Sequence, residues 1–329
     1  EGMRWSQLYG GERIAVRAVL RGLRGTGGPG AACWGCARRR GQIQEGQDQE
    51  VLQERLAALI AAVLLSATLT LPAAAPAADE PAAQDRYPKA AASYLVAIDG
   101  KVVWAREPDT PRLPASLSKI MTALLLLEGD WKPESEVLIS REAAAATRSR
   151  AGLREGERMS AGDLLTAMLV SSANDACLAL AEHASGSAKA FVAGMNEKAR
   201  ALQLPSTHFE DPRGHDAPQQ RSSARDLLAL AEKALANPEF SRIVALPSAT
   251  VKTKGGRSIT VKTGNHLLGR VEGVEGVKSG WTPGAGKCVV VFARRGATRV
   301  FVVLLNSPDR WWTAAGLTQA AFDAARAHP

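Results

Sequence analysis

Apolar residues along the chain predict strands near both ends of its second part and helices between them. Ser93–Ile98 and Lys101–Arg106 are apolar-rich and flank Asp99-Gly100, a dipeptide typical of a tight β-hairpin. Near the C-terminus, residues 288–294 and 299–305 are two further β-rich runs separated by a short polar segment. The pattern therefore predicts one hairpin at each end of this region.

Between the two hairpins, apolar residues recur at helical spacing. Residues 120–128 are dense in leucine, and residues 160–169 begin with Ser160 and Asp163, which resemble a helix-capping pair. We expect further helices at 174–182, 188–202, 223–235 and 311–327, and a small hairpin of 250–252 with 258–262.

The order of these elements indicates the fold class. Strands come first, then a helical block, then strands and a last helix, without regular alternation of strand and helix. We therefore expect an α+β fold, in which an antiparallel sheet built from N- and C-terminal strands holds a helical block between them. The first and last strands should share that sheet.

An uncharged apolar run, residues 56–71, precedes these elements. Arg55 lies before it and the small residues 72–78, with Ala75-Pro76-Ala77, follow it, as in a secretory signal. The run is shorter than the about 20 residues of a membrane-spanning helix, although an uncleaved anchor is the alternative. We expect an upstream extension outside the native protein at 1–55, a signal peptide at 56–78, a linker at 79–88 and one folded domain at 89–329.

Composition and cysteine content exclude several classes of protein. The formal charge of +8 comes from mixed signs without dense basic runs, so no nucleic-acid partner is expected. Cys33 and Cys36 form a lone Cys-x-x-Cys with no second pair to complete a zinc site. Cys177 and Cys288 lie in apolar runs and are expected to be buried free thiols. No metal or organic cofactor is implied.

Two short motifs in the helical block could support nucleophilic chemistry. Ser116 and Lys119 are three residues apart at the start of a predicted helix, so they share one face. A serine nucleophile needs an adjacent base, and lysine can be that base only if burial lowers its pKa. The second motif is Ser172-Ala173-Asn174 between two helices, for which a helix cap is the alternative interpretation.

A third motif is available at two places in the sequence. Lys278-Ser279-Gly280 lies in the strand-like segment 276–282 and offers an ammonium group, a hydroxyl group and a bare backbone. Lys262-Thr263-Gly264 has the same character and is a literal Lys-Thr-Gly. The residues alone leave the choice between them open.

Together the motifs resemble the Ser-x-x-Lys, Ser-x-Asn and Lys-Thr-Gly signature of the serine D-alanyl-D-alanine carboxypeptidases. These are low-molecular-mass penicillin-binding proteins of the β-lactamase/transpeptidase-like superfamily. The resemblance covers residues 90–310, nearly all of the proposed domain. The family's frame around its third motif matches residues 277–286, which favours Lys278 over Lys262.

The resemblance implies a substrate and roles for individual residues. The substrate would be a peptidoglycan stem peptide ending in D-Ala-D-Ala, and β-lactams would be inhibitors. Ser116 would form the acyl-enzyme, Lys119 would take its proton, Ser172 would pass a proton to the leaving group, and Asn174 would orient Lys119. Substrate binding is expected from Lys278, which would keep the site positive, and from Ser279, Gly280, Trp281 and Arg310, with Arg294 and Arg295 as secondary candidates. The backbone N–H groups of Ser116 and Trp281 would form the oxyanion hole.

The chain departs from the family pattern at two places. Ser279 stands where the family usually has threonine, and Pro212-Arg213-Gly214-His215 replaces a Pro-x-Gly-Leu pattern. Because of the predicted signal, we expect an exported, periplasmic or extracytoplasmic protein that contacts the membrane only if this signal stays uncleaved. The alternative functions are a DD-endopeptidase, a β-lactamase and a non-catalytic cell-wall-binding relative.

Overall fold

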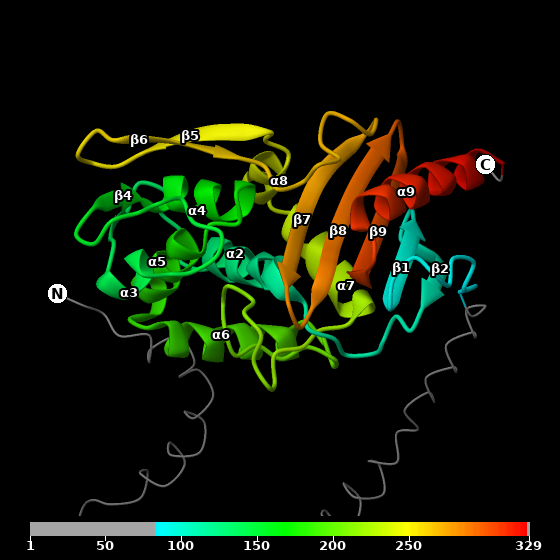
Figure 1. The fold of residues 1–329 in the computed structure, drawn as a ribbon, viewed down its shortest axis with the longest axis horizontal. Helices are drawn as coiled ribbons and strands as arrows, with labels where there is room; N and C mark the ends of the chain where they lie inside the picture. The colour runs from blue at the N-terminus through cyan, green and yellow to red at the C-terminus, as the bar shows by residue number, and fades with distance from the viewer. Residues whose placement is uncertain (1–82, 328–329) are drawn as a thin grey trace, which may run out of the picture. The chain divides into compact units, whose positions relative to one another are not determined.

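The computed structural model describes residues 83–327, which form a five-stranded sheet with helices on both of its faces (Figure 1). The predicted signal at 56–78 and the Cys33–Cys36 pair lie outside the described residues. All neighbouring strands are antiparallel, in the order β2-β1-β9-β8-β7. The strands are β1 Ser93–Ile98, β2 Lys101–Arg106, β7 Val274–Thr282, β8 Gly286–Arg295 and β9 Thr298–Ser307. The expected α+β fold is confirmed, since β1 pairs directly with β9.

Side chains of the central strands are buried on both faces of the sheet. In β1, Tyr94 and Val96 pack with the C-terminal helix α9 (Arg310–Ala327), which crosses one face in Figure 1. Leu95 and Ala97 point the other way, into the core shared with the remaining helices. Because alternate side chains of a strand point to opposite faces, a strand that is covered on both faces of the sheet needs apolar residues at every position. This explains the unbroken apolar runs at both ends of the sequence.

The helical block lies between β2 and β7 in the chain. Helix α2 (Lys119–Glu128) follows the short 3-10 helix η2 (Ala115–Ser118) and packs against four other helices of the block. The other helices are α3 Arg141–Ala144, α4 Ala161–Val170, α5 Asn174–Ser185, α6 Ala188–Ala201, α7 Ala224–Leu235 and α8 Pro238–Val244. Two small hairpins complete the fold, β3 Glu136–Leu138 with β4 Arg158–Ser160 and β5 Ser248–Lys252 with β6 Ser258–Lys262.

The helix starts follow the capping residues of the sequence. The Ser160 side chain accepts a hydrogen bond from the Asp163 backbone at the start of α4, as predicted. Helix α5, in contrast, begins at Asn174 after Ala173 and has no side-chain cap. The capping interpretation of Ser172 and Asn174 is therefore wrong, and the Asn174 side chain is used elsewhere. The short elements α3, α8, β3 and β4 were not predicted.

Asp175 anchors the loop between α3 and β4 to the start of α5. Its side chain is fully buried, and its carboxylate accepts hydrogen bonds of 2.9–3.0 Å from the backbone of Ala151, Gly152 and Leu153. The backbone N–H of Asn174 donates to the Ser149 carbonyl in the same loop. These bonds hold the loop against the start of α5. Among residues 83–327, no helix is both long enough and apolar enough to cross a membrane.

We predict that Asp175→Ala lowers the free energy of unfolding by about 3 kcal/mol, because it leaves buried backbone donors without an acceptor. Urea denaturation followed by circular dichroism measures the change. The control is Asp130→Ala, which removes an exposed carboxylate paired with Lys132 and should change stability by less than about 0.5 kcal/mol. Equal stability of the two variants would contradict the anchoring role of Asp175.

Candidate active site

Ser116 lies in a tight turn just before helix α2. The sequence places it at the start of a helix, whereas the structure puts it in η2, with α2 beginning at Lys119. Ala115 immediately before it has a φ of 51°, a conformation that costs energy in a residue with a Cβ. The turn leaves Ser116 half-buried while Lys119 is fully buried. Ser116 is thus partly exposed to solvent, whereas Lys119 is not.

The amine of Lys119 contacts three oxygen atoms. Its Nζ donates to Asn174 Oδ1 at 2.7 Å and to the carbonyl oxygen of Arg213 at 2.7 Å, and it lies 3.2 Å from Ser116 Oγ. The expected pairing of Ser116 with Lys119 and Asn174 is therefore present. The Arg213 carbonyl was not predicted from the sequence.

These three contacts suit a neutral amine that acts as a base. A neutral –NH₂ group has two hydrogens and one lone pair. A carbonyl or amide oxygen can only accept, so Asn174 and Arg213 take the two hydrogens. The lone pair is then left for the hydroxyl hydrogen of Ser116. Burial lowers the pKa of Lys119 from 10.5 to about 8, although the nearby Asp211 and Asp175 carboxylates oppose this shift.

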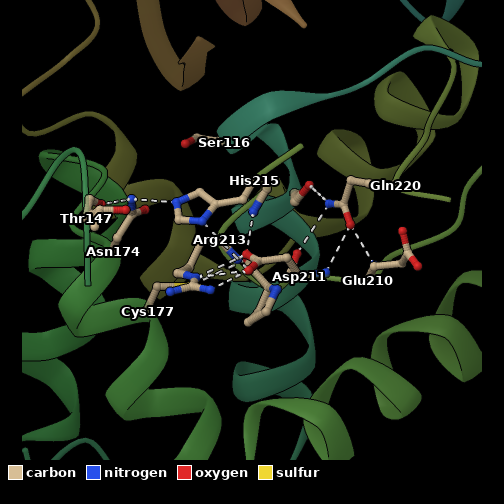
Figure 2. A network of polar contacts seen from close by, with 12 residues as sticks. Ser116, Thr147, Asn174, Cys177, Glu210, Asp211, Arg213, His215 and Gln220 are labelled. Carbon is tan, nitrogen blue, oxygen red and sulfur yellow. Dashed lines mark hydrogen bonds and ion pairs between the residues drawn. The ribbon is translucent and has the colours of Figure 1, made fainter. Parts of the chain in front are cut away.

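The Arg213 carbonyl is held in place by the loop between α6 and α7 (Figure 2). Asp211 accepts hydrogen bonds from the backbone of Arg213 and Gly214 and forms an ion pair with the Arg213 guanidinium. Gln220 bonds to Ser118 Oγ in η2 and to the backbone of Asp211. At Gly214, which has a φ of 86°, a Cβ atom would lie 1.9 Å from the Ala115 carbonyl oxygen. The loop therefore packs directly on the turn that carries Ser116.

Strand β7 forms the opposite side of the site. A Cβ atom on Gly280 would lie 2.6 Å from the backbone nitrogen of Ser116, so the bare backbone lets β7 approach the turn. Ser279 is half-buried and its hydroxyl donates to the Gly264 carbonyl at 3.1 Å. Trp281 is 54% exposed, and the Arg148 guanidinium lies 5.9 Å from the centre of its ring.

Lys278 is more deeply buried than the sequence suggests. Its Nζ donates to the Ser279 carbonyl at 2.8 Å, and its side chain is only 4% exposed. Burial lowers the pKa of Lys278 well below its usual value, and the neighbouring cations Lys119 and Arg310 lower it further. Burial thus opposes the permanent positive charge expected at this position.

The literal Lys262-Thr263-Gly264 sequence is not the third motif of the site. Lys262 ends β6 and is exposed. The backbone of Gly264 nevertheless reaches the site, because its carbonyl accepts from Ser279 and its N–H donates to Val170 at the end of α4. The third motif is therefore the segment that includes Lys278, and the Gly264 carbonyl supports it by accepting the hydrogen bond of Ser279.

Ser172 lies in the turn between α4 and α5. Its φ of 61° is unusual for a serine. Its Oγ atom is buried and has no hydrogen-bond partner among the described residues. A buried hydroxyl without a partner costs free energy, and such groups gather at functional sites. This group is free to bond to a molecule that enters the site.

The arginine candidates separate into two groups. Arg310, at the start of α9, donates through Nη1 to the carbonyl oxygen of Gly280, so it contacts the backbone of the motif strand. Its Nε atom is buried without a partner in the described part of the chain. Arg294 is paired with Glu275, and Arg295 packs on the Phe322 ring. Of these three arginines, Arg310 is the one that contacts the site.

The two remaining cysteines are buried and unpaired, as predicted. Cys177 lies close to the site, where its thiol donates to the Pro212 carbonyl, and burial raises its pKa to about 11. Cys288 is buried in β8, and burial likewise raises its pKa to about 11. Within residues 83–327, no three His, Cys, Asp or Glu side chains gather as a metal site would require.

Comparison with known proteins gives a family match over most of the chain. Residues 80–309 match the model of the D-alanyl-D-alanine carboxypeptidase family. The D-alanyl-D-alanine carboxypeptidase DacF of Bacillus subtilis is 32% identical over 224 residues, which are 67% of this chain and 58% of that protein. A D-alanyl-D-alanine endopeptidase of Pseudomonas aeruginosa is 32% identical over 63% of this chain and 68% of its own length. The chain thus spans little more than half of the Bacillus relative.

A solved structure with the same fold covers the described domain. The crystal structure of the Streptomyces K15 DD-transpeptidase aligns with a TM-score of 0.68 and 29% sequence identity. The alignment covers 75% of this chain and all of that chain.

We predict that Lys119 loses its proton near pH 8, because its amine is buried. In protein labelled with ¹³C-lysine, the Cε and Cδ signals of Lys119 should shift with a midpoint of about 8. A Lys119→Met variant, which lacks these signals, assigns them and separates them from those of Lys278. A midpoint above 10 would show that the site does not favour a neutral amine.

Proposed function

The chain belongs to the D-alanyl-D-alanine carboxypeptidase family, and on this premise we propose that it is a serine DD-carboxypeptidase. It removes the terminal D-Ala from peptidoglycan stem peptides through an acyl-enzyme on Ser116, and β-lactams bind at the same residue. The observation that carries the proposal is the buried Lys119 amine, whose contacts leave one lone pair for the Ser116 hydroxyl.

Acylation begins with transfer of the Ser116 proton to Lys119. The freed oxygen attacks the carbonyl carbon of the penultimate D-Ala and forms a tetrahedral intermediate. The backbone N–H groups of Ser116 and Trp281 stabilise its oxyanion, a role supported by the close approach of β7 at Gly280. Such preorganised donors typically lower a barrier by about 3–4 kcal/mol.

The leaving group departs with a proton passed on by Ser172. The carbon–nitrogen bond breaks, the nitrogen of the terminal D-Ala takes up the proton, and the penultimate D-Ala remains as an ester on Ser116. The unpartnered Oγ of Ser172 supports this role, because the hydroxyl has no competing bond in the described residues. Water then hydrolyses the ester and frees Ser116.

Strand β7 and its neighbours bind the substrate. The stem peptide lies along β7, where Gly280 leaves the backbone open to it. The terminal carboxylate accepts a hydrogen bond from Ser279 and faces the positive charge of Arg310, while Asn174 holds Lys119 and binds a substrate amide. Lys278 supports this surface through its bond to the Ser279 carbonyl. Trp281 is exposed on the same strand, next to Gly280.

The enzyme acts outside the cytoplasm, where peptidoglycan is found. Residues 56–78 are the signal that exports it, and residues 89–329 are its catalytic domain. The arrangement of an arginine, an apolar run and small residues in this signal supports export.

We predict that a fluorescent penicillin labels the wild-type protein covalently and does not label Ser116→Ala, because the variant has no hydroxyl to acylate. Lys119→Ala should be labelled about 1,000-fold more slowly, since the base is lost. Gel fluorescence after timed incubation measures both effects. A Ser185→Ala control changes an exposed serine and should label like wild type. If Ser116→Ala is labelled as strongly as wild type, Ser116 is not the acylated residue, and the result favours a non-catalytic cell-wall-binding relative.

A second candidate function is DD-endopeptidase activity, which the name of the Pseudomonas relative favours. Both reactions use the same nucleophile and differ in the group that leaves, a single D-Ala or the side chain of a second stem peptide. We predict that the enzyme releases D-Ala from a purified pentapeptide faster than it cleaves a cross-linked dimer, with mass spectrometry identifying the products. Faster cleavage of the dimer would identify an endopeptidase instead. The Ser116→Ala variant, inactive on both substrates, is the control.

A further inference from the structure

The amide group of Asn174 has a partner outside the three motifs. Its Nδ2 donates to the Thr147 carbonyl at 2.7 Å and lies 3.2 Å from Nε2 of His215. An amide nitrogen carries two hydrogens and cannot accept, so Nε2 of His215 must be the acceptor. The ring is therefore neutral, with its proton on Nδ1.

The other side of the ring faces a carboxylate. His215 Nδ1 lies 3.9 Å from Asp211 Oδ2, which is too far for a direct hydrogen bond but close enough for electrostatic attraction. Figure 2 shows the ring between Asn174 and the Asp211–Arg213 pair. The arrangement favours the tautomer that the Asn174 contact requires.

We infer that His215 is a positioning residue for the reaction. Its neutral ring, together with the Thr147 carbonyl, fixes the Asn174 amide so that Oδ1 faces Lys119, and protonation of the ring releases this hold. The inference rests on the proposed function, because it concerns how Lys119 is kept ready to act on Ser116.

Protonation of His215 would place two donors against each other. The new Nε2–H would point at the Nδ2 hydrogens of Asn174, and the amide could not simply rotate to accept it. Rotation would turn Oδ1 toward the Thr147 carbonyl and would remove the acceptor of Lys119. The hydrogen bond must therefore break, and Lys119 loses part of its orientation.

Four charged groups act on the His215 ring. Asp211 and Arg213 belong to its own loop, Lys119 comes from α2, and Arg148 comes from the loop after α3. Burial is the main cause that lowers the pKa of His215, the three cations lower it further, and Asp211 opposes them. The ring is thus neutral throughout the range near pH 8 in which Lys119 loses its proton. Its own protonation follows at lower pH, as a separate step.

The test is the second-order rate constant for acylation by a fluorescent penicillin, measured from pH 5 to pH 9. For wild type, its logarithm should fall with a slope of one below about pH 8 and fall more steeply where His215 becomes charged, at a pH below its usual pKa of 6.5. His215→Gln keeps an acceptor that cannot be protonated in this range. It should match wild type within about threefold at pH 8 and should show no steepening at low pH.

His215→Leu removes the acceptor and should acylate about tenfold more slowly at pH 8, again without steepening. His183→Gln changes a histidine at the far end of α5 and should keep the complete wild-type profile. Thermal melting identifies any variant that fails to fold. In that case, ¹⁵N NMR of the wild-type histidines still decides, since His215 should be protonated at Nδ1 and not at Nε2.

The inference is overturned if His215→Gln steepens like wild type, if His215→Leu reacts as fast as wild type, or if Nε2 carries the proton at pH 8. The proposed function fails differently, because wild-type protein would then not react with penicillin at any pH. In that outcome the NMR tautomer alone decides whether His215 holds Asn174.

Discussion

The site depends on one constraint, the hydrogen bonding of the Lys119 amine, which is fully buried. Charge on such an amine is costly, so burial favours the neutral form. A neutral amine has only two hydrogens, and both are taken by oxygens that can only accept, one from Asn174 and one from the Arg213 backbone. The remaining lone pair has one available direction, toward Ser116. Removing either acceptor would leave the orientation of the amine undetermined.

Segments far apart in the sequence supply these acceptors, and each is anchored by its own polar contacts. Asn174 is the first residue of α5, and its side chain bridges the Thr147 loop and the amine of Lys119. The loop of Arg213 is held by the Asp211 carboxylate and by Gln220, which reaches the turn of Ser116 through Ser118. Apolar packing of α2 against the other helices positions the amine, and these polar contacts orient it.

Local patterns in the sequence predict every strand except β3 and β4, most helices, and the first two motifs, whereas the choice of Lys278 over Lys262 comes from the family resemblance. Unbroken apolar runs identify β1 and β9, because the side chains of both strands are buried on both faces of the sheet. Spacing within a motif identifies Ser116 with Lys119. Such patterns cannot reveal contacts made across the fold, such as the Arg213 carbonyl on Lys119 or His215 on Asn174. Every residue has a backbone carbonyl, so the amino-acid type at a position does not show where that carbonyl will bond. The short elements α3 and β3 were missed because they depend on tertiary packing more than on a periodic apolar pattern.

The bond between Ser279 and Gly264 has a consequence for selectivity. The hydroxyl is already satisfied by a neutral carbonyl oxygen, so an incoming group gains only the difference between the old partner and the new one. A neutral amide oxygen offers almost nothing in this exchange, whereas an ionised oxygen makes a stronger bond. In the proposed substrate complex, Ser279 would therefore favour a ligand whose last group is ionised over one whose last group is neutral.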